Sequence, residues 1–219
     1  MPDNARRRTR TELEPKILPS QHRSQATFNA ILAASGEVLA EAGLDGFSTN
    51  AVCRRAGLTP PALYRYFPNK YALLKAVGEQ LMEAQDRCVL RWLTADEGLV
   101  ADGTALAAAL YEMLSEVVQA TARFKGSATI LRAMRTEPIL RDVRQSSIGF
   151  LVKQAVAQLR KLHPTAPLAE IQRVARVSVE AGTAMVELAI EETCADADEL
   201  LRGAATMIAH YQATLRRTP

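Results

Sequence analysis

The strongest signal in this chain is the stretch Ser48 to Lys70, which reads STNAVCRRAGLTPPALYRYFPNK. Its spacing predicts two short helices separated by a tight turn. Thr49 is suited to cap the first helix, because a threonine hydroxyl accepts an amide hydrogen of the first turn, and Gly57 suits the left-handed position after its end. Thr59 is suited to cap the second helix, and the two prolines after it cost little in a first turn.

The second of these helices is brief and has two unlike sides. Its spacing turns Leu63, Tyr66 and Phe67 toward a core and leaves Tyr64 and Arg65 facing outward. Two helices joined by a glycine-containing turn form a helix-turn-helix, whose second helix enters the major groove of DNA. The pattern therefore predicts a DNA-binding element.

A longer run around this element resembles a known family. From Phe47 to Leu73 the chain reads F-S-T-x-x-V-x-x-x-A-G-L-T-x-x-x-L-Y-x-Y-F-P-N-K-x-x-L, which is similar to the DNA-binding signature of the TetR family of bacterial transcriptional regulators. The resemblance implies an all-α fold of about nine helices. It would have an N-terminal three-helix DNA-binding domain with the helix-turn-helix, and a C-terminal helical ligand-binding and dimerisation domain. It also implies a ligand-responsive repressor that binds a palindromic operator as a homodimer.

Composition agrees with a helical globular protein. Of the 219 residues, 48% are hydrophobic and only 5% are aromatic, and alanine is abundant, which favours helix over sheet. No apolar run reaches the roughly 18 residues that a membrane span needs, so no membrane partner is expected. The cysteines, Cys53, Cys88 and Cys194, are odd in number and widely spaced. A disulfide framework or zinc site is therefore not expected, and a cytoplasmic location is.

Charge and composition also suggest where the parts begin and end. Residues 1–80 carry eleven Lys and Arg against seven Asp and Glu, so positive charge collects in the part with the helix-turn-helix. Residues 1–22 are expected to be a disordered basic arm, which either contacts DNA or is a solvated tail. Residues 23–70 are the predicted DNA-binding domain, and residues 71–219 are the predicted ligand-sensing and dimerisation domain.

Hydrophobic periodicity and cap residues predict the remaining helices. Ser24 is expected to cap the first helix and Gly43 to end it. A long helix after Asn69 is expected to run from the DNA-binding part into the rest of the chain, and Pro138 is expected to begin another. The predicted ranges are 25–42, 70–93, 102–122, a short helix ending near residue 135, 138–162, 168–193 and 197–216.

The resemblance implies particular contacts with DNA. Phosphates would meet Thr49, Thr59, Tyr64 and Lys70, with Arg23 and Ser24 as weaker candidates. Bases would be read by Asn50, Pro60, Pro61 and Ala62, and Arg65 could reach a phosphate or a guanine. Asn50 is the one polar reader, because asparagine pairs with adenine through two hydrogen bonds. With so few polar readers, DNA shape is expected to contribute to specificity.

The resemblance also implies a small, often apolar effector held among the helices behind the DNA-binding part. Methionine and aromatic side chains at helical spacing are candidates for its cavity, although the same residues also make ordinary core. The candidates are Met82, Trp92, Met113, Phe124, Met134, Phe150, Gln154 and Met185.

The last two predicted helices are unusually apolar. On 168–193 the polar residues form one narrow stripe, so this helix must be covered on more than one side. One chain of this length can hardly bury both helices, and the resemblance implies a two-fold dimer that pairs them into a four-helix bundle. The alternative is that both are interior to one chain. The stripe consists of Arg173, Arg176, Glu180, Glu187 and Glu191, and the predicted interface of Ile171, Val179, Val186, Ile190, Leu201, Ala205, Ile208, Tyr211 and Leu215.

No pattern of residues points to catalysis or a cofactor. The chain has no glycine-rich phosphate loop, no H-E-x-x-H and no cysteine or histidine cluster at metal spacing. Glu191 and Glu192 are expected to form a solvated face rather than a catalytic pair. Two other functions stay open, a helical small-molecule-binding protein with a vestigial helix-turn-helix and a protein-interaction module. The effector, the operator and the choice between activator and repressor also stay open.

Overall fold

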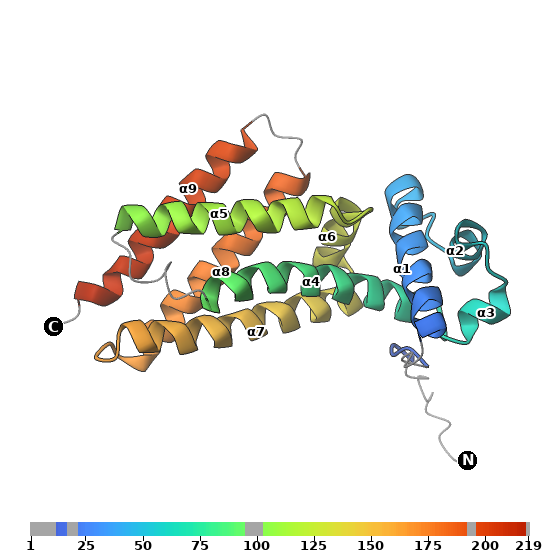
Figure 1. Cartoon of the computed structure of the whole chain (residues 1–219), viewed down its shortest axis with the longest axis horizontal. Helices are drawn as coiled ribbons and strands as arrows, with labels where there is room; N and C mark the ends of the chain where they lie inside the picture. The colour runs from blue at the N-terminus through green and yellow to red at the C-terminus, as the bar shows by residue number, and fades with distance from the viewer. Residues whose placement is uncertain (1–11, 17–21, 95–102, 192–195, 218–219) are drawn as a thin grey trace, which may run out of the picture.

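The computed structural model describes residues 12–16, 22–94, 103–191 and 196–217, and within these ranges the chain is helical with no strand. Figure 1 shows a small group of helices at one end, α1 to α3, and a larger bundle of long helices that ends in α9. None of the helices in the described ranges is long and apolar enough to cross a membrane. The helices are α1 (His22–Ala42), α2 (Thr49–Ala56), α3 (Pro60–Tyr64), α4 (Lys70–Thr94), α5 (Gly103–Ala122), α6 (Ser127–Thr136), α7 (Pro138–Leu162), α8 (Leu168–Glu191) and α9 (Ala197–Gln212).

The helix-turn-helix forms where the sequence predicts it, but one of its caps differs. Ser48, not Thr49, caps α2, because its hydroxyl accepts the amide hydrogen of Ala51 at 3.2 Å. Gly57 follows α2 with φ +65°, in the left-handed region that glycine adopts without strain. Thr59 stands at the cap position of α3, but its side chain makes no capping hydrogen bond.

The first helix begins earlier than predicted. It starts at His22, so Ser24 lies inside α1 rather than at its cap. Its hydroxyl lies 3.1 Å from the Tyr66 hydroxyl instead, which ties α1 to the segment after α3. Gly43, with φ +65°, ends the helix as expected.

Part of the predicted disordered arm is packed against the domain. The Lys16 amide donates to the Tyr66 carbonyl, and the Asn69 side-chain amide donates to the Glu12 carbonyl, both at 2.8 Å. Lys75 pairs with the Glu14 carboxylate at the same distance. Residues 12–16 are therefore not a free arm. The expectation for residues 1–11 and 17–21 lies outside the described residues.

A single hydrophobic cluster joins the N-terminal helices α1 to α3 to the start of the bundle. It contains Leu39 of α1, Leu63 of α3, Leu73 and Leu81 of α4, and continues to Met134 of α6, all of them 0% exposed. Cys53 is buried in the same cluster, and burial raises the pKa of its thiol. The predicted domain boundary between residues 70 and 71 therefore does not separate two hydrophobic cores, because one cluster contains residues from both sides of it.

The C-terminal helices build two further clusters. The first lies among α4, α5, α8 and α9, and the second joins α7 and α8 to the end of the chain. Pro138 is the first residue of α7, as predicted. The last helix ends at Gln212, earlier than the predicted 216, and continues as a short 3₁₀ helix, Ala213–Arg217.

Candidate nucleic-acid interface and inner cavity

The residues predicted to meet DNA come from α2, α3 and the start of α4, at the free end of the molecule (Figure 1). Ala62 and Thr49 are half-buried. Tyr66 and Phe67 are buried on the other side of the segment, so the two-sided pattern predicted for it is confirmed. The exposed members of the predicted set are Asn50, Thr59, Pro60, Pro61, Tyr64, Arg65 and Lys70.

Three helices begin at this end. The Thr49 hydroxyl lies 3.1 Å from the Tyr64 hydroxyl, so the start of α2 and the end of α3 are held together. The Asn69 side chain caps α4, because its oxygen accepts the amide hydrogens of Tyr71 and Ala72 at 2.9 Å. None of the first turns of α2, α3 or α4 contains an acidic residue. A helix N-terminus carries partial positive charge and free amide hydrogens, so α2 and α4 favour anions such as phosphate here.

Ion pairs hold α2 on α1. Arg55 of α2 pairs with Glu41 and, at 3.2 Å, with Glu37, and Lys125 pairs with Glu37 at 2.7 Å. The hydrogen bond from Lys125, followed by that from Arg55, lowers the pKa of Glu37. The hydrogen bond from Arg55 lowers the pKa of Glu41. Arg55 is therefore engaged within the protein rather than offered to DNA.

A cavity of about 90 Å³ lies among α4, α5, α7, α8 and α9. This is several times the ~10–15 Å³ that one buried water needs. Apolar side chains dominate its wall, and no charged side chain lines it in the described part of the chain. The lining residues are Gln85, Val89, Trp92, Leu93, Leu110, Met113, Leu114, Val117, Leu151, Ala155, Ser178, Val179, Gly182, Thr183, Val186, Ile208 and Gln212.

Few of the residues predicted to bind an effector line this cavity. Trp92 and Met113 do. Met82 and Met134 are buried in the cluster shared with the DNA-binding end, and Phe124 packs against that cluster. Phe150 is 41% exposed, Met185 packs against the cluster of α5 and α9, and Gln154 is half-buried elsewhere on α7.

The cavity has polar groups that the sequence prediction missed. The Gln85 side-chain amide donates to the Thr121 hydroxyl at 2.8 Å, and the Gln212 amide donates to the Ser178 hydroxyl at 3.5 Å. Gln85 falls on the buried stripe of α4, between Leu81 and Cys88. A polar residue on an otherwise apolar stripe was the signal that could have revealed it.

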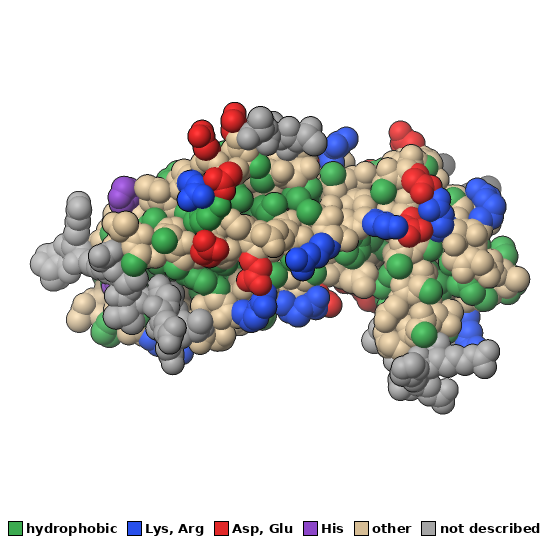
Figure 2. Space-filling view, turned by 45° about the horizontal axis from the view of Figure 1, so that its top comes forward, with side chains coloured by type: hydrophobic (Ala, Val, Ile, Leu, Met, Phe, Trp, Pro, Cys, Tyr) green, Lys and Arg blue, Asp and Glu red, His purple; other side chains and the backbone are tan. Residues whose placement is uncertain are grey.

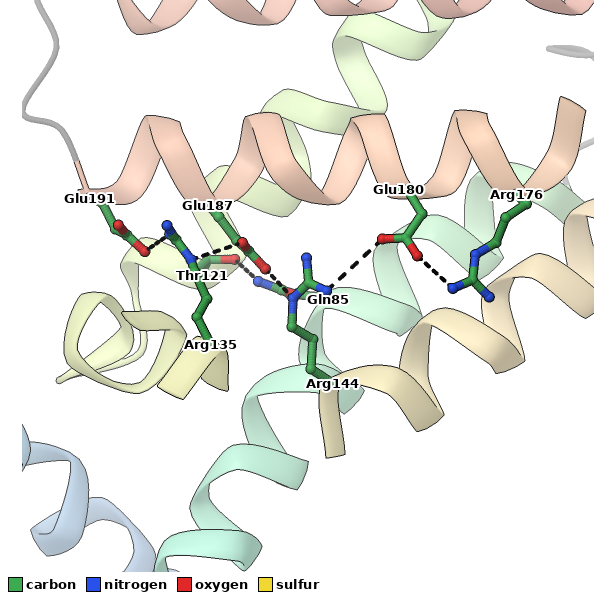
Figure 3. A network of polar contacts seen from close by, with 8 residues as sticks. All are labelled: Gln85, Thr121, Arg135, Arg144, Arg176, Glu180, Glu187 and Glu191. Carbon is green, nitrogen blue, oxygen red and sulfur yellow. Dashed lines mark hydrogen bonds and ion pairs between the residues drawn. The ribbon is translucent and has the colours of Figure 1, made fainter. Parts of the chain in front are cut away.

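The C-terminal part of the polar stripe of α8, Glu187 and Glu191, is not a face open to solvent, whereas Arg173 and Arg176 are exposed. Glu187 is 5% exposed, and Arg144 of α7 donates to it at 2.6 Å. Arg135 of α6 lies between Glu187, at 3.5 Å, and Glu191 (Figure 3). The expectation that Glu191 belongs to a solvated face is therefore wrong, and Glu192 lies outside the described residues. The stripe joins α8 to α6 and α7 within one chain.

Most of the predicted dimer interface is buried within one chain. The residues between 1% and 5% exposed are Ile171, Val186, Leu201, Ala205, Ile208 and Leu215, and Val179, Ile190 and Tyr211 are half-buried. These six buried residues cannot face a second subunit, so their assignment is wrong. The apolar side chains that α8 and α9 do expose include Val177, at 46%, and Met207, at 53%. Figure 2 shows hydrophobic side chains lying among charged ones over the C-terminal helices.

Comparisons of the sequence with known proteins match mainly its N-terminal part. The model of a family described as bacterial regulatory proteins, tetR family, matches residues 31–77. The tetracycline repressor protein class A from transposon 1721 of Escherichia coli is 41% identical over 54 residues, which cover 25% of each chain. The HTH-type transcriptional regulator UidR of Escherichia coli K12 is 32% identical over 79 residues, covering 36% of this chain and 39% of that protein. The matched stretches thus span well under half of these relatives.

The whole fold also has solved counterparts. Salmonella enterica GusR superposes on this chain with a TM-score of 0.63 at 20% sequence identity. The alignment covers 88% of this chain and 96% of the GusR chain. At this identity the likeness establishes a shared fold, which extends the correspondence from the N-terminal helices to the C-terminal ones.

Proposed function

We propose that this chain is a ligand-responsive transcriptional repressor of the TetR family, because residues 31–77 match the model of that family and the whole chain shares its fold with Salmonella enterica GusR. The observation that carries the proposal is the helix-turn-helix itself. It lies within the matched residues 31–77, and Asn50, Tyr64 and Arg65 are exposed on it. A regulator of chromosomal DNA acts in the cytoplasm, and we propose that location.

Phosphate contacts in this proposal come from side chains around the helix N-termini. Lys70 and Tyr64 are exposed and polar, and Thr49 is joined to Tyr64 by a hydrogen bond. Such contacts fix the position of a protein on DNA, whereas groups that reach base edges read the sequence. Asn50 and Arg65 are the polar readers, and Pro60 to Ala62 offer apolar contact to a thymine methyl group.

The proposed regulator is a homodimer that pairs through α8 and α9. The support is the exposed apolar surface of both helices, which includes Val177 and Met207. A two-fold dimer carries two recognition helices and so binds a palindromic site, with half-sites about 34–36 Å apart.

The effector would bind in the inner cavity, and its binding would shift the population of the dimer between two states. Ligand can shift that equilibrium only by its difference in affinity for the two states. In one state the two recognition helices match the half-site spacing, and in the other they do not.

Selection of bound DNA from a random pool tests the proposal. The expected result is an enriched palindrome with half-sites one helical turn apart, bound with an affinity that falls as salt rises. A chain that recovers no sequence over the starting pool, and whose weak retention does not depend on salt, would instead fit a helical ligand-binding protein.

A further inference from the structure

The chemistry of the inner cavity narrows what it can bind. Apart from Gln85, Ser178, Thr183, Gln212 and the indole of Trp92, its described wall is apolar, and no charged side chain faces it there. An ionised ligand would lose its hydration without gaining a partner of opposite charge, which is costly. The cavity therefore favours a neutral and mostly apolar molecule.

One donor in the wall lacks an acceptor. The Nε1–H group of Trp92 is buried and makes no hydrogen bond within the described residues. Buried polar groups in proteins almost always have a partner, because an unsatisfied one keeps the full cost of its desolvation. An indole nitrogen can only donate, so the missing partner is an acceptor.

Gln85, Gln212 and Ser178, three other polar groups in the wall, are already engaged with the protein. The Gln85 amide donates to Thr121, and the Gln212 amide donates to Ser178. Gln85 and Trp92 both line the cavity from α4, seven residues apart. At a rise of 1.5 Å per residue they stand ~10 Å apart along the helix axis. A ligand that reaches both is elongated, with its acceptor at the Trp92 end.

We propose that this cavity binds a neutral, elongated, mainly apolar molecule with one carbonyl-type oxygen, which accepts a hydrogen bond from Trp92 Nε1. The inference rests on the effector site of the proposed function and adds the chemical class of the ligand. It also gives Trp92 the role of selecting an oxygen-bearing compound over a hydrocarbon of the same shape.

The full-length chain reports on this binding by itself, because Trp92 is the only tryptophan in the sequence. Octan-2-one is the neutral probe, and octanoate is its charged counterpart. Octan-2-one is expected to change the emission of Trp92 with saturation, and octanoate to bind at least roughly tenfold more weakly. Equal or tighter binding of octanoate, or no effect of octan-2-one, would overturn the proposal.

The hydrogen bond is tested with a hydrocarbon of matching shape. In 2-methyloct-1-ene a CH₂ group replaces the carbonyl oxygen of octan-2-one, and headspace partitioning measures the binding of both volatile probes without a spectroscopic label. Trp92→Phe is expected to weaken octan-2-one roughly five- to tenfold and to change the alkene less than twofold. An equal change for both probes would show that Trp92 contributes shape alone and would refute the selection.

Two controls separate this inference from the proposed function. Val179→Phe fills the cavity from α8 and is expected to abolish binding of both probes, whereas unaltered binding would place them elsewhere and contradict the proposal. DNA binding is measured separately on the same protein without probe. Saturable ketone binding by a chain that binds no DNA would support the ligand class and reject the regulator. DNA binding without ketone binding would support the regulator and reject the proposed ligand class.

Discussion

Base reading at the predicted interface depends on very few polar residues. Asn50 is exposed on the first turn of α2, beside prolines and an alanine that offer no hydrogen bond. We expect Asn50→Ala to relax the preference at one base pair in each half-site by about 1–3 kcal/mol. Binding-site selection with the variant measures this, and Gln145→Ala on α7 is the control. The same enriched motif for Asn50→Ala and the unaltered chain would remove Asn50 from the readers.

Lys70 is expected to contact a phosphate rather than a base, because it is exposed at the positive start of α4. We expect Lys70→Ala to weaken binding to all DNA sequences alike and to lower the salt slope by about one ion. Titrations at several salt concentrations measure the slope. Lys153→Ala, which removes an exposed lysine of α7, should leave it unchanged. If both variants gave the slope of the unaltered chain, Lys70 would have no phosphate contact.

The N-cap of α2 shows what the sequence could not predict for a single residue. Ser48 and Thr49 are adjacent and both have a hydroxyl suited to a helix start, so sequence alone cannot decide between them. The structure uses Ser48 for the cap and leaves the Thr49 hydroxyl beside Tyr64. The two helices of the helix-turn-helix were predictable because they follow local spacing. The partners of their hydroxyls depend on which helices meet.

Among the elements, α1 and the connection between α5 and α6 approach unusually closely. A Cβ atom added to Gly36 would lie 2.6 Å from the Lys125 carbonyl oxygen, and one on Gly126 would lie 2.6 Å from the Gly36 carbonyl oxygen. We expect Gly36→Ala to force the two segments apart and to lower the free energy of unfolding by about 1–3 kcal/mol.

A matched variant separates this crowding from the general effect of adding a methyl group to a helix. A Cβ on Gly149 of α7 would meet no atom within 4 Å, so Gly149→Ala should be neutral or stabilise by up to about 1 kcal/mol. Urea unfolding measures both variants. Similar stabilities for Gly36→Ala and Gly149→Ala would show that α1 can move aside without cost.

The ion pairs of α8 should contribute differently to the free energy of unfolding, according to how buried each pair is. Arg144 is bonded to the buried Glu187, whereas Arg176 pairs with Glu180 near the surface of the same helix (Figure 3). We expect Arg144→Ala to cost roughly 1–3 kcal/mol of unfolding free energy, because a buried carboxylate loses a partner. Arg176→Ala should cost less than about 1 kcal/mol. Thermal unfolding compares them, and equal losses would contradict the assignment of the buried pair.

The same stripe explains why elements were easier to predict than their surroundings. Periodicity placed α7 and α8 well, since helix formation follows local spacing and caps. The charges on α8 have the pattern of a wet face, yet Arg135 and Arg144 come from two other helices to meet them. A sequence pattern gives the side of a helix on which charges lie, but not the charges that pack against it.

For the whole molecule, the proposed dimer leads to a test of assembly. Val177 and Met207 are exposed apolar side chains on α8 and α9, and the proposed partner would cover them. We expect the double variant Val177→Glu, Met207→Glu to be monomeric in sedimentation equilibrium, because burying unpaired carboxylates opposes association. Phe150→Glu, at a 41% exposed position of α7, should stay dimeric. A double variant that keeps the mass of the unaltered chain would exclude this face.

The predicted interface failed at this scale for a physical reason. An apolar side chain loses its contact with water equally well inside one chain or between two, and the sequence pattern is the same. Ile171 and Ile208 point into the core of their own chain. The helices and the exposed face of the helix-turn-helix followed from local pattern, whereas the cavity and the outer face of α8 and α9 depend on how distant helices pack.

The hydrophobic cluster that runs from α1 through α4 to α6 bears on whether the two predicted domains could be exchanged separately in evolution. A recombination that joined a new sensor directly after residue 70 would leave the buried surfaces of Leu39 and Leu63 without their neighbours on α4 and α6. Recombinants should therefore survive when the donor brings side chains of matching volume at positions such as Leu73, Leu81 and Met134. The helix-turn-helix would then be inherited together with the parts of α4 and α6 that pack against it.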